Sequence, residues 1–248
     1  FLKAGYQESG RLNRTEQGTP QGGNLSPMLA NIFLHYVLDA WFVKGIRPRV
    51  KGYCHLVRYA DDFICMVQHP RTARCLEIWL QQRFEKFGLT LHPQKTRVIS
   101  FGRNERGDAR REGRKANTFD FLGFTHYCGV SCKGNFLVGR KTSRKKFHRA
   151  CRELNDWLRQ VRNAMRIQDL WPLLAAKLRG HYNYYGVSGN SRGIASFGFA
   201  ATRMVAKWLN RRSQCKSFTW NKLNDYLTCN PLPKPLIVHN LYRPLPLE

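Results

Sequence analysis

The stretch Leu56-Val57-Arg58-Tyr59-Ala60-Asp61-Asp62-Phe63-Ile64-Cys65-Met66-Val67 decides the fold of the first half of the chain. Two apolar runs rich in β-forming residues flank a tight turn at Ala60-Asp61-Asp62, and this pattern predicts a β-hairpin. The strands are expected to be buried among neighbouring elements because only Arg58 interrupts their apolar character. The turn has to emerge from that cover, since two anions cannot be buried without partners.

The paired carboxylates at the predicted hairpin tip have two interpretations. Asp61 and Asp62 on a rigid hairpin would offer the oxygen ligands that Mg²⁺ prefers. The alternative is that an Asp-Asp pair is simply a solvated turn. Tyr59 and Ala60 directly before the pair, together with the rest of the chain, favour the metal site.

The composition indicates a polyanionic partner. The 248 residues include 42 Lys and Arg against 16 Asp and Glu, a net charge of +26, which favours binding to nucleic acid. A membrane-surface role is the weaker alternative because the basic residues are spread over most of the chain. There is no apolar run near the roughly 18 residues that span a bilayer. Scattered cysteines and the lack of a signal peptide predict a cytoplasmic protein, and the charge predicts that it is associated with nucleic acid.

A glycine-rich turn precedes the first predicted helix. It runs through Gly18-Thr19-Pro20-Gln21-Gly22-Gly23, and Ser26-Pro27 then predicts a helix start. Free amides at such a turn can bind phosphate, although a purely structural loop is the alternative. A further helix is predicted over residues 73–88.

The middle of the chain predicts mostly extended structure. Two short extended pieces around a proline turn are expected in residues 89–101, and a mobile surface loop in residues 102–118. Residues 119–127 are predicted as a strand, which residues 135–138 complete as a hairpin.

A change to basic, helical sequence near Arg140 predicts a domain boundary. The expected domains are residues 1–139, a helical domain at 140–230 and an extended, proline-rich tail at 231–248. Three helices are expected in the second domain, beginning near residues 141, 168 and 191, and they would form an antiparallel bundle. Thr219 is predicted to cap a brief fourth helix that reaches Cys229.

Several blocks, in this order and spacing, resemble the later palm blocks of reverse transcriptases, specifically the bacterial group II intron type that also act as maturases. The blocks that carry the resemblance are Gly18–Gly23 with Leu25–Pro27, Tyr59–Asp62, Gly88–Leu91 with Lys95-Thr96, Phe121–Phe124 and the thumb-like stretch Leu178–Gly186.

The resemblance implies an α+β fold, with the antiparallel sheet and helices of a right-hand polymerase palm followed by an all-α three-helix thumb (maturase, or X) domain. It implies RNA-directed DNA polymerisation by a two-metal mechanism. Asp61 and Asp62 would bind Mg²⁺ at the YADD turn, and Lys95 would neutralise or protonate pyrophosphate, a solvated lysine being the alternative. The implied partners are an RNA template (group II intron RNA), a DNA primer or target, and dNTPs.

The same resemblance implies roles in substrate binding. Gln21 and Gly22 would lie beside the incoming nucleotide, and Tyr59 with Ala60 would lie close to the primer end. Leu122 and Gly123 resemble the primer grip, where a backbone turn braces the primer strand.

The thumb-like half would bind the template and primer. Arg144, Lys145 and Arg179 would contact phosphates. His181, Tyr182 and Tyr185 would stack on bases or sugars, or would form the core of the bundle instead.

The chain departs from the family in one important respect. The fingers and an earlier palm aspartate would lie in a segment upstream of Phe1, and Asp39 sits in the wrong helix to replace that aspartate. The isolated polypeptide is therefore expected to bind RNA but to polymerise poorly or not at all. The alternatives are a non-catalytic RNA-binding maturase fragment, or a reverse transcriptase of a CRISPR or diversity-generating system.

Overall fold

The computed structural model describes residues 6–8, 11–13, 25–212 and 219–242. The chain forms two compact units, residues 1–99 and residues 100–248, and each is described by itself. The expected boundary near residue 140 stays a prediction. Among the described residues, no helix is both long enough and apolar enough to cross a membrane.

The first unit begins with a short strand pair and a series of helical segments. Strands β1 (Tyr6–Glu8) and β2 (Arg11–Asn13) pair antiparallel. The helical segments that follow are α1 (Ser26–Leu34), the π-helical η1 (His35–Asp39) and η2 (Phe42–Ile46), and the 3₁₀ turn η3 (Arg47–Arg49).

The predicted first helix is present, but its buried residues do not follow the periodicity of a regular α-helix. No residue of α1 is buried, whereas Val37 and Leu38 in η1 and Phe42 and Ile46 in η2 are almost fully covered. A π-helix winds with i→i+5 hydrogen bonds, so the apolar stripe moves away from its α-helical register at residue 35.

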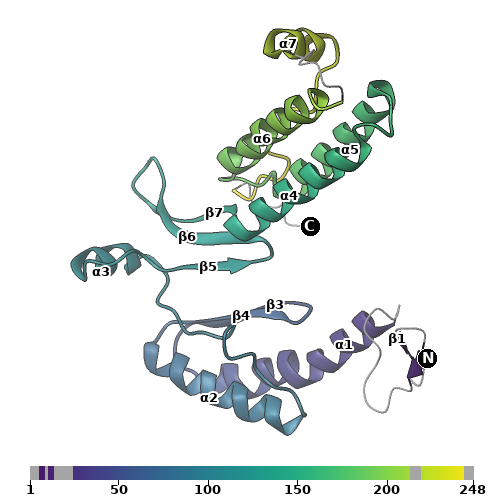
Figure 1. Cartoon of the computed structure of the whole chain (residues 1–248). Helices are drawn as coiled ribbons and strands as arrows, with labels where there is room; N and C mark the ends of the chain where they lie inside the picture. The colour runs from purple at the N-terminus through teal and green to yellow at the C-terminus, as the bar shows by residue number, and fades with distance from the viewer. Residues whose placement is uncertain (1–5, 9–10, 14–24, 213–218, 243–248) are drawn as a thin grey trace, which may run out of the picture. The chain divides into compact units, whose positions relative to one another are not determined.

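The predicted hairpin is confirmed as β3 (Cys54–Tyr59) and β4 (Asp62–Val67), which pair antiparallel from Cys54 opposite Val67 to Tyr59 opposite Asp62. Helix α2 (Pro70–Lys86) follows, and Gly88 beyond its end has a φ of 68°, as a glycine that ends a helix does. In Figure 1, α1 and α2 lie on the same side of the hairpin. The core of this unit is formed by η1, η2, β3 and α2, and it consists of Val37, Leu38, Phe42, Ile46, Cys54, Leu76, Leu80 and Phe84.

The second unit begins with a segment where the structure corrects the sequence prediction. Residues 102–118 were expected to be a mobile loop, but they contain helix α3 (Glu105–Arg111). The reason is a buried polar anchor. Glu105 is 2% exposed and accepts hydrogen bonds from Arg114 (2.5 Å) and from the Asn117 amide (2.8 Å).

A three-stranded antiparallel sheet follows, in the order β5 (Thr118–Phe121), β6 (Phe124–Val130) and β7 (Phe136–Thr142). The strand predicted over residues 119–127 is therefore two strands. The break falls at Leu122 and Gly123, whose φ values of 48° and 81° turn the backbone back on itself.

The predicted helical bundle is confirmed. Its helices are α4 (Arg144–Val161), α5 (Ile167–Tyr185) and α6 (Ser191–Leu209), and the short helix α7 (Trp220–Cys229) follows. The Ser143 hydroxyl caps α4, and the Thr219 hydroxyl caps α7 as predicted. Leu158, Leu174, Leu178, Ile194 and Val205 are among the bundle's fully buried residues. Antiparallel sheets with helices, followed by a helical bundle, confirm the α+β class.

Candidate active site and nucleic-acid interface

The β3–β4 hairpin places two carboxylates at its tip. Tyr59 pairs with Asp62, so only Ala60 and Asp61 form the connection between the strands. Ala60 has a φ of 52°, which is uncommon for a residue with a Cβ. Asp61 and Asp62 are both exposed, and within the described residues neither has an ion pair or a side-chain hydrogen bond. Both are thus free to bind a ligand.

Arg58 fixes this turn from beneath. Its guanidinium donates to both carboxylate oxygens of Asp39, at 2.8 and 2.6 Å. The remaining nitrogen donates to the Asn31 side chain (2.9 Å) and to the Ala60 carbonyl oxygen (2.8 Å). The hydrogen bond to Asp39 raises the pKa of Arg58 above its ordinary value. Ala60 is therefore held by a hydrogen bond from Arg58, and Arg58 is in turn fixed by an ion pair with Asp39, 19 residues before it in the chain.

The tip carboxylates fit part of a magnesium site. Mg²⁺ in phosphoryl-transfer sites is typically bound by one or two carboxylates and completes its shell with waters and substrate phosphates. Asp61 and Asp62 would supply the carboxylates. The described residues contain no group of three or more His, Cys, Asp and Glu side chains arranged to hold a metal, and Asp39 is paired with Arg58. The remaining ligands would have to come from outside these side chains.

The other predicted residues of the nucleotide site are only partly brought together. Tyr59 is 66% exposed next to the carboxylates. Lys95 is exposed in a turn after α2, and its side chain forms no hydrogen bond or ion pair in the described part of the chain. Gln21 and Gly22 lie outside the described residues. The role of Lys95 stays a prediction.

Leu122 and Gly123, the predicted primer-grip residues, form a turn that α5 supports. We call it the grip turn. The Tyr184 hydroxyl donates a hydrogen bond of 3.0 Å to the Leu122 carbonyl oxygen, and its ring stacks on Phe124. A Cβ on Gly123 would lie 3.1 Å from the Tyr185 hydroxyl. Because both turn residues have positive φ, the tyrosines of α5 hold a conformation that the turn alone would not favour.

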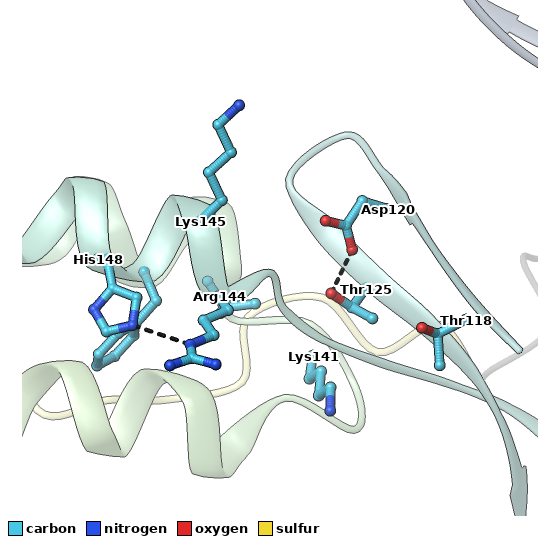
Figure 2. Close-up of a pocket in the computed structure, with 9 residues that line it drawn as sticks. Thr118, Asp120, Thr125, Lys141, Arg144, Lys145 and His148 are labelled. Atoms are coloured by element: carbon cyan, nitrogen blue, oxygen red, sulfur yellow. Dashed lines mark hydrogen bonds between the residues drawn. The ribbon is translucent and has the colours of Figure 1, made fainter. Parts of the chain in front are cut away.

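A basic cavity of about 740 Å³ lies where the sheet meets the first turn of α4 (Figure 2). Lys141, Arg144, Lys145 and His148 line it, with Arg144 and His148 in contact at 3.4 Å. Asp120 is the one acidic side chain of the lining, and it accepts a hydrogen bond from Thr125 (2.5 Å). The arrangement can bind phosphates, since several cations face an open cavity. The sequence had indicated Arg144 and Lys145 but not Lys141 or His148.

The remaining predicted thumb contacts fall into two groups. Arg179 is exposed on α5. Tyr182, however, is 4% exposed in the bundle core, and His181 stacks on Phe197 with ring centroids 3.6 Å apart. Burial lowers the pKa of His181 to about 4, so the ring is neutral at pH 7 and offers no charge to a phosphate.

Tyr185 is half-buried and packs against Phe124 and His181. The positions of His181, Tyr182 and Tyr185 agree with the alternative that these rings form the core of the bundle, and the Tyr185 hydroxyl also lies close to Gly123. Their stacking on RNA stays a prediction.

Two residues that matter for the site were missed or underused at the sequence level. Arg58 supports the turn that carries Asp61, and its signal was its position as the lone charge in two apolar strands. Tyr184 supports the grip turn, but nothing in its own stretch of sequence indicates a partner 62 residues away.

A comparison with known families agrees with the hairpin and its carboxylates. The family described as "Reverse transcriptase (RNA-dependent DNA polymerase)" matches residues 2–126, about half of the chain. The chain belongs to the reverse transcriptase family. The hairpin with Asp61 and Asp62 and the sheet as far as His126 lie inside the matched region, and α4 to α7 lie outside it.

Similarity to individual proteins points to one group of reverse transcriptases. The chain is 66% identical over 35 residues to the group II intron-encoded protein LtrA of Lactococcus lactis subsp. cremoris, and equally to that of its strain MG1363. The matched segment covers 14% of this chain and only 6% of each relative. The match supports a group II intron reverse transcriptase.

Proposed function

We propose that this chain provides the carboxylate hairpin and the helical grip of a group II intron reverse transcriptase that copies RNA into DNA. The observation that carries the proposal is the β3–β4 hairpin, which presents Asp61 and Asp62 exposed and, within the described residues, without ion pairs, while Arg58 fixes the turn. Reverse transcriptases generally use a divalent metal and act on a template and a primer. The two-metal mechanism, Mg²⁺ and intron RNA are parts of the proposal.

The proposed chemistry assigns a role to each element. The primer 3′-oxygen forms a bond to the α-phosphorus of the dNTP, the bond to pyrophosphate breaks, and the hydroxyl proton leaves to solvent or a base. Mg²⁺ bound at the tip would neutralise the phosphates and make the hydroxyl more acidic. The carboxylates of Asp61 and Asp62 are exposed, so a metal ion could reach them. Arg58 would keep the turn that carries them in place through its hydrogen bond to the Ala60 carbonyl oxygen. The Leu122–Gly123 turn and the basic cavity at α4 would position the primer.

The first test is metal binding, which does not require a complete polymerase. We expect Asp61→Asn and Asp62→Asn to weaken Mn²⁺ binding, measured by water proton relaxation, by tenfold or more. Asp225→Asn is the matched control because Asp225 is an exposed aspartate on α7 and loses the same charge. Equal Mn²⁺ affinity in all three variants would contradict the proposed metal site.

Primer extension on an RNA template tests the activity itself. Any extension by the 248-residue chain is expected to be weak, to be lost in Asp61→Asn and to be retained in Asp225→Asn. Strong extension by the isolated chain would show that no further ligand is needed. Loss of extension in both Asp61→Asn and Asp225→Asn would mean that the effect of Asp61→Asn is not specific to the hairpin, and it would contradict the catalytic role of Asp61.

A second candidate, an RNA-binding maturase fragment without catalysis, is favoured by the basic cavity at α4. Salt-sensitive RNA binding without metal binding at Asp61 would support this candidate over the first. The reverse transcriptases of CRISPR or diversity-generating systems are a weaker alternative, because the matching relatives are intron-encoded proteins.

A further inference from the structure

Helix α3 and the turn before it carry three arginines that have no acidic partner in the described part of the chain. The segment 102–117 has three acidic residues, and ion pairs engage all of them: Asp108 pairs with Arg111, while Glu105 and Glu112 pair with Arg114. Arg103, Arg106 and Arg110 are exposed and form no ion pair within the described part of the chain. We call these three residues the α3 arginine cluster.

The cluster lines an open depression of about 350 Å³ between α3 and the turn that joins β6 to β7. Val130, Gly134 and Phe136 form the opposite wall. Arg106 and Arg110 are four residues apart and share one face of the helix, where like charges destabilise it. A ligand that brings negative charge into the depression would remove this repulsion.

Gly107 keeps the depression open. A glycine inside a helix is unfavourable, and a Cβ at this position would meet no atom within 4 Å. Packing within the protein therefore does not require glycine here. The missing side chain leaves room beside the guanidinium groups for a ligand to approach the helix backbone.

The depression is distinct from the basic cavity at α4. The pair Phe124–Thr142 at one end of the β6–β7 ladder lies near the α4 cavity, and the pair Val130–Phe136 at the other end lines the depression. A strand of this length spans roughly 20 Å. The unit thus has two separate cationic sites along one sheet.

We propose that the α3 arginine cluster binds the phosphodiester backbone of a nucleic-acid strand. Guanidinium groups pair well with phosphate oxygens, and such contacts give affinity without sequence readout. The inference rests on the proposed function, because it adds a second contact for the RNA that the chain would bind.

The test is the salt dependence of binding to a 20-base-pair RNA duplex, with Arg106→Gln and Arg110→Gln compared with Arg111→Gln. Arg111 lies on the same helix and loses the same charge, but it is paired with Asp108. Each phosphate contact contributes about 0.7 to 0.9 to the slope of log K against log salt. This slope is negative, and we expect Arg106→Gln and Arg110→Gln each to make it less steep by about that amount. Arg111→Gln should leave the slope unchanged.

A second variant separates shape from charge. Gly107→Leu keeps the net charge, suits a helix and fills the depression, so it is expected to weaken binding severalfold while circular dichroism shows no loss of helix. If Gly107→Leu bound RNA as tightly as wild type, or if the three arginine variants had equal slopes, the inference would be overturned. The proposed function would not be affected by either result. Absence of salt-dependent RNA binding by the unmodified chain would overturn the proposed function as well. The same slope changes on a DNA duplex would assign the site to phosphodiesters of either kind.

Discussion

Arg58 and Asp39 form a bidentate ion pair that joins the β3–β4 hairpin to the helical segment η1, with N–O distances of 2.8 and 2.6 Å. The Arg58 side chain is 13% exposed and the Asp39 side chain 25%, so both are largely withdrawn from water. Because Arg58 also donates to the Ala60 carbonyl, the position of the carboxylate turn depends on a residue that is not part of it.

A double-mutant cycle measures this coupling. We expect Arg58→Ala and Asp39→Ala each to destabilise the chain, and the double variant to be less destabilised than their sum by about 1–3 kcal/mol. The measurement is urea unfolding. Arg71→Ala is the control, because Arg71 is exposed on α2 and should add independently to Asp39→Ala. Additive behaviour of Arg58 and Asp39 would contradict the coupling.

Adding one methyl group to the grip turn should lower the stability of the protein. Gly123→Ala should lower the free energy of unfolding by about 1–3 kcal/mol, because φ is 81° and the new Cβ would crowd the Tyr185 hydroxyl. Gly113→Ala is a matched control, since Gly113 has a φ of 65° but open space around it. The control should show only the smaller backbone cost. Equal losses in the two variants would mean that Tyr185 does not brace the turn.

Glu105 predicts a loss of stability in acid. Its hydrogen bonds from Arg114, outweighing the opposing effect of burial, lower the pKa of Glu105 from 4.5 to about 2. The folded state therefore holds the carboxylate while the unfolded chain takes up a proton, and stability is lost as the pH falls from about 4.5 to 2. Glu105→Gln should have a lower Tm than wild type at pH 7, and the difference should shrink over this window.

The isosteric control is Glu77→Gln, an exposed glutamate on α2 that should leave the Tm at pH 7 unchanged. A Tm difference between wild type and Glu105→Gln that stays constant from pH 7 to pH 2.5 would contradict the assignment of Glu105 as a buried anion.

His181 predicts a pH effect in a different range. Burial lowers its pKa from 6.5 to about 4, so the unfolded chain binds a proton that the folded protein does not as the pH falls through this interval. Stability should fall from pH 6.5 to pH 4. His181→Phe retains a ring for stacking on Phe197 and removes this contribution. Urea unfolding of both proteins at several pH values should show that the variant gains on wild type as the pH falls. An unchanged difference would refute the buried neutral histidine.

The sequence was informative where local pattern decides structure. The hairpin, the caps of α7 and the bundle helices follow from alternation, turn chemistry and helical periodicity, each of which acts over a few residues. Asp61 and Asp62 were placed at a hairpin tip for the same reason. The positions of these elements could be predicted because no distant partner is needed to specify them.

The missed features depend on partners far along the chain. Helix α3 looked like a loop because its charged composition hides the buried pairing of Glu105 with Arg114 and the Asn117 amide. The strand at residues 119–127 looked continuous because Leu122 is apolar, and a positive φ at a leucine needs outside support. The role of Arg58 was hidden because its partner Asp39 lies in a different element.

The hydrogen bond from Tyr184 to Leu122 has a consequence for how the protein is made. The two residues are 62 positions apart, and the turn at Leu122 is set by a helix that the ribosome synthesises much later. During synthesis the sheet residues emerge first, without the brace that stabilises their unusual backbone. The grip turn should therefore reach its final form only after α5 has folded against it, which makes this turn a late step of folding.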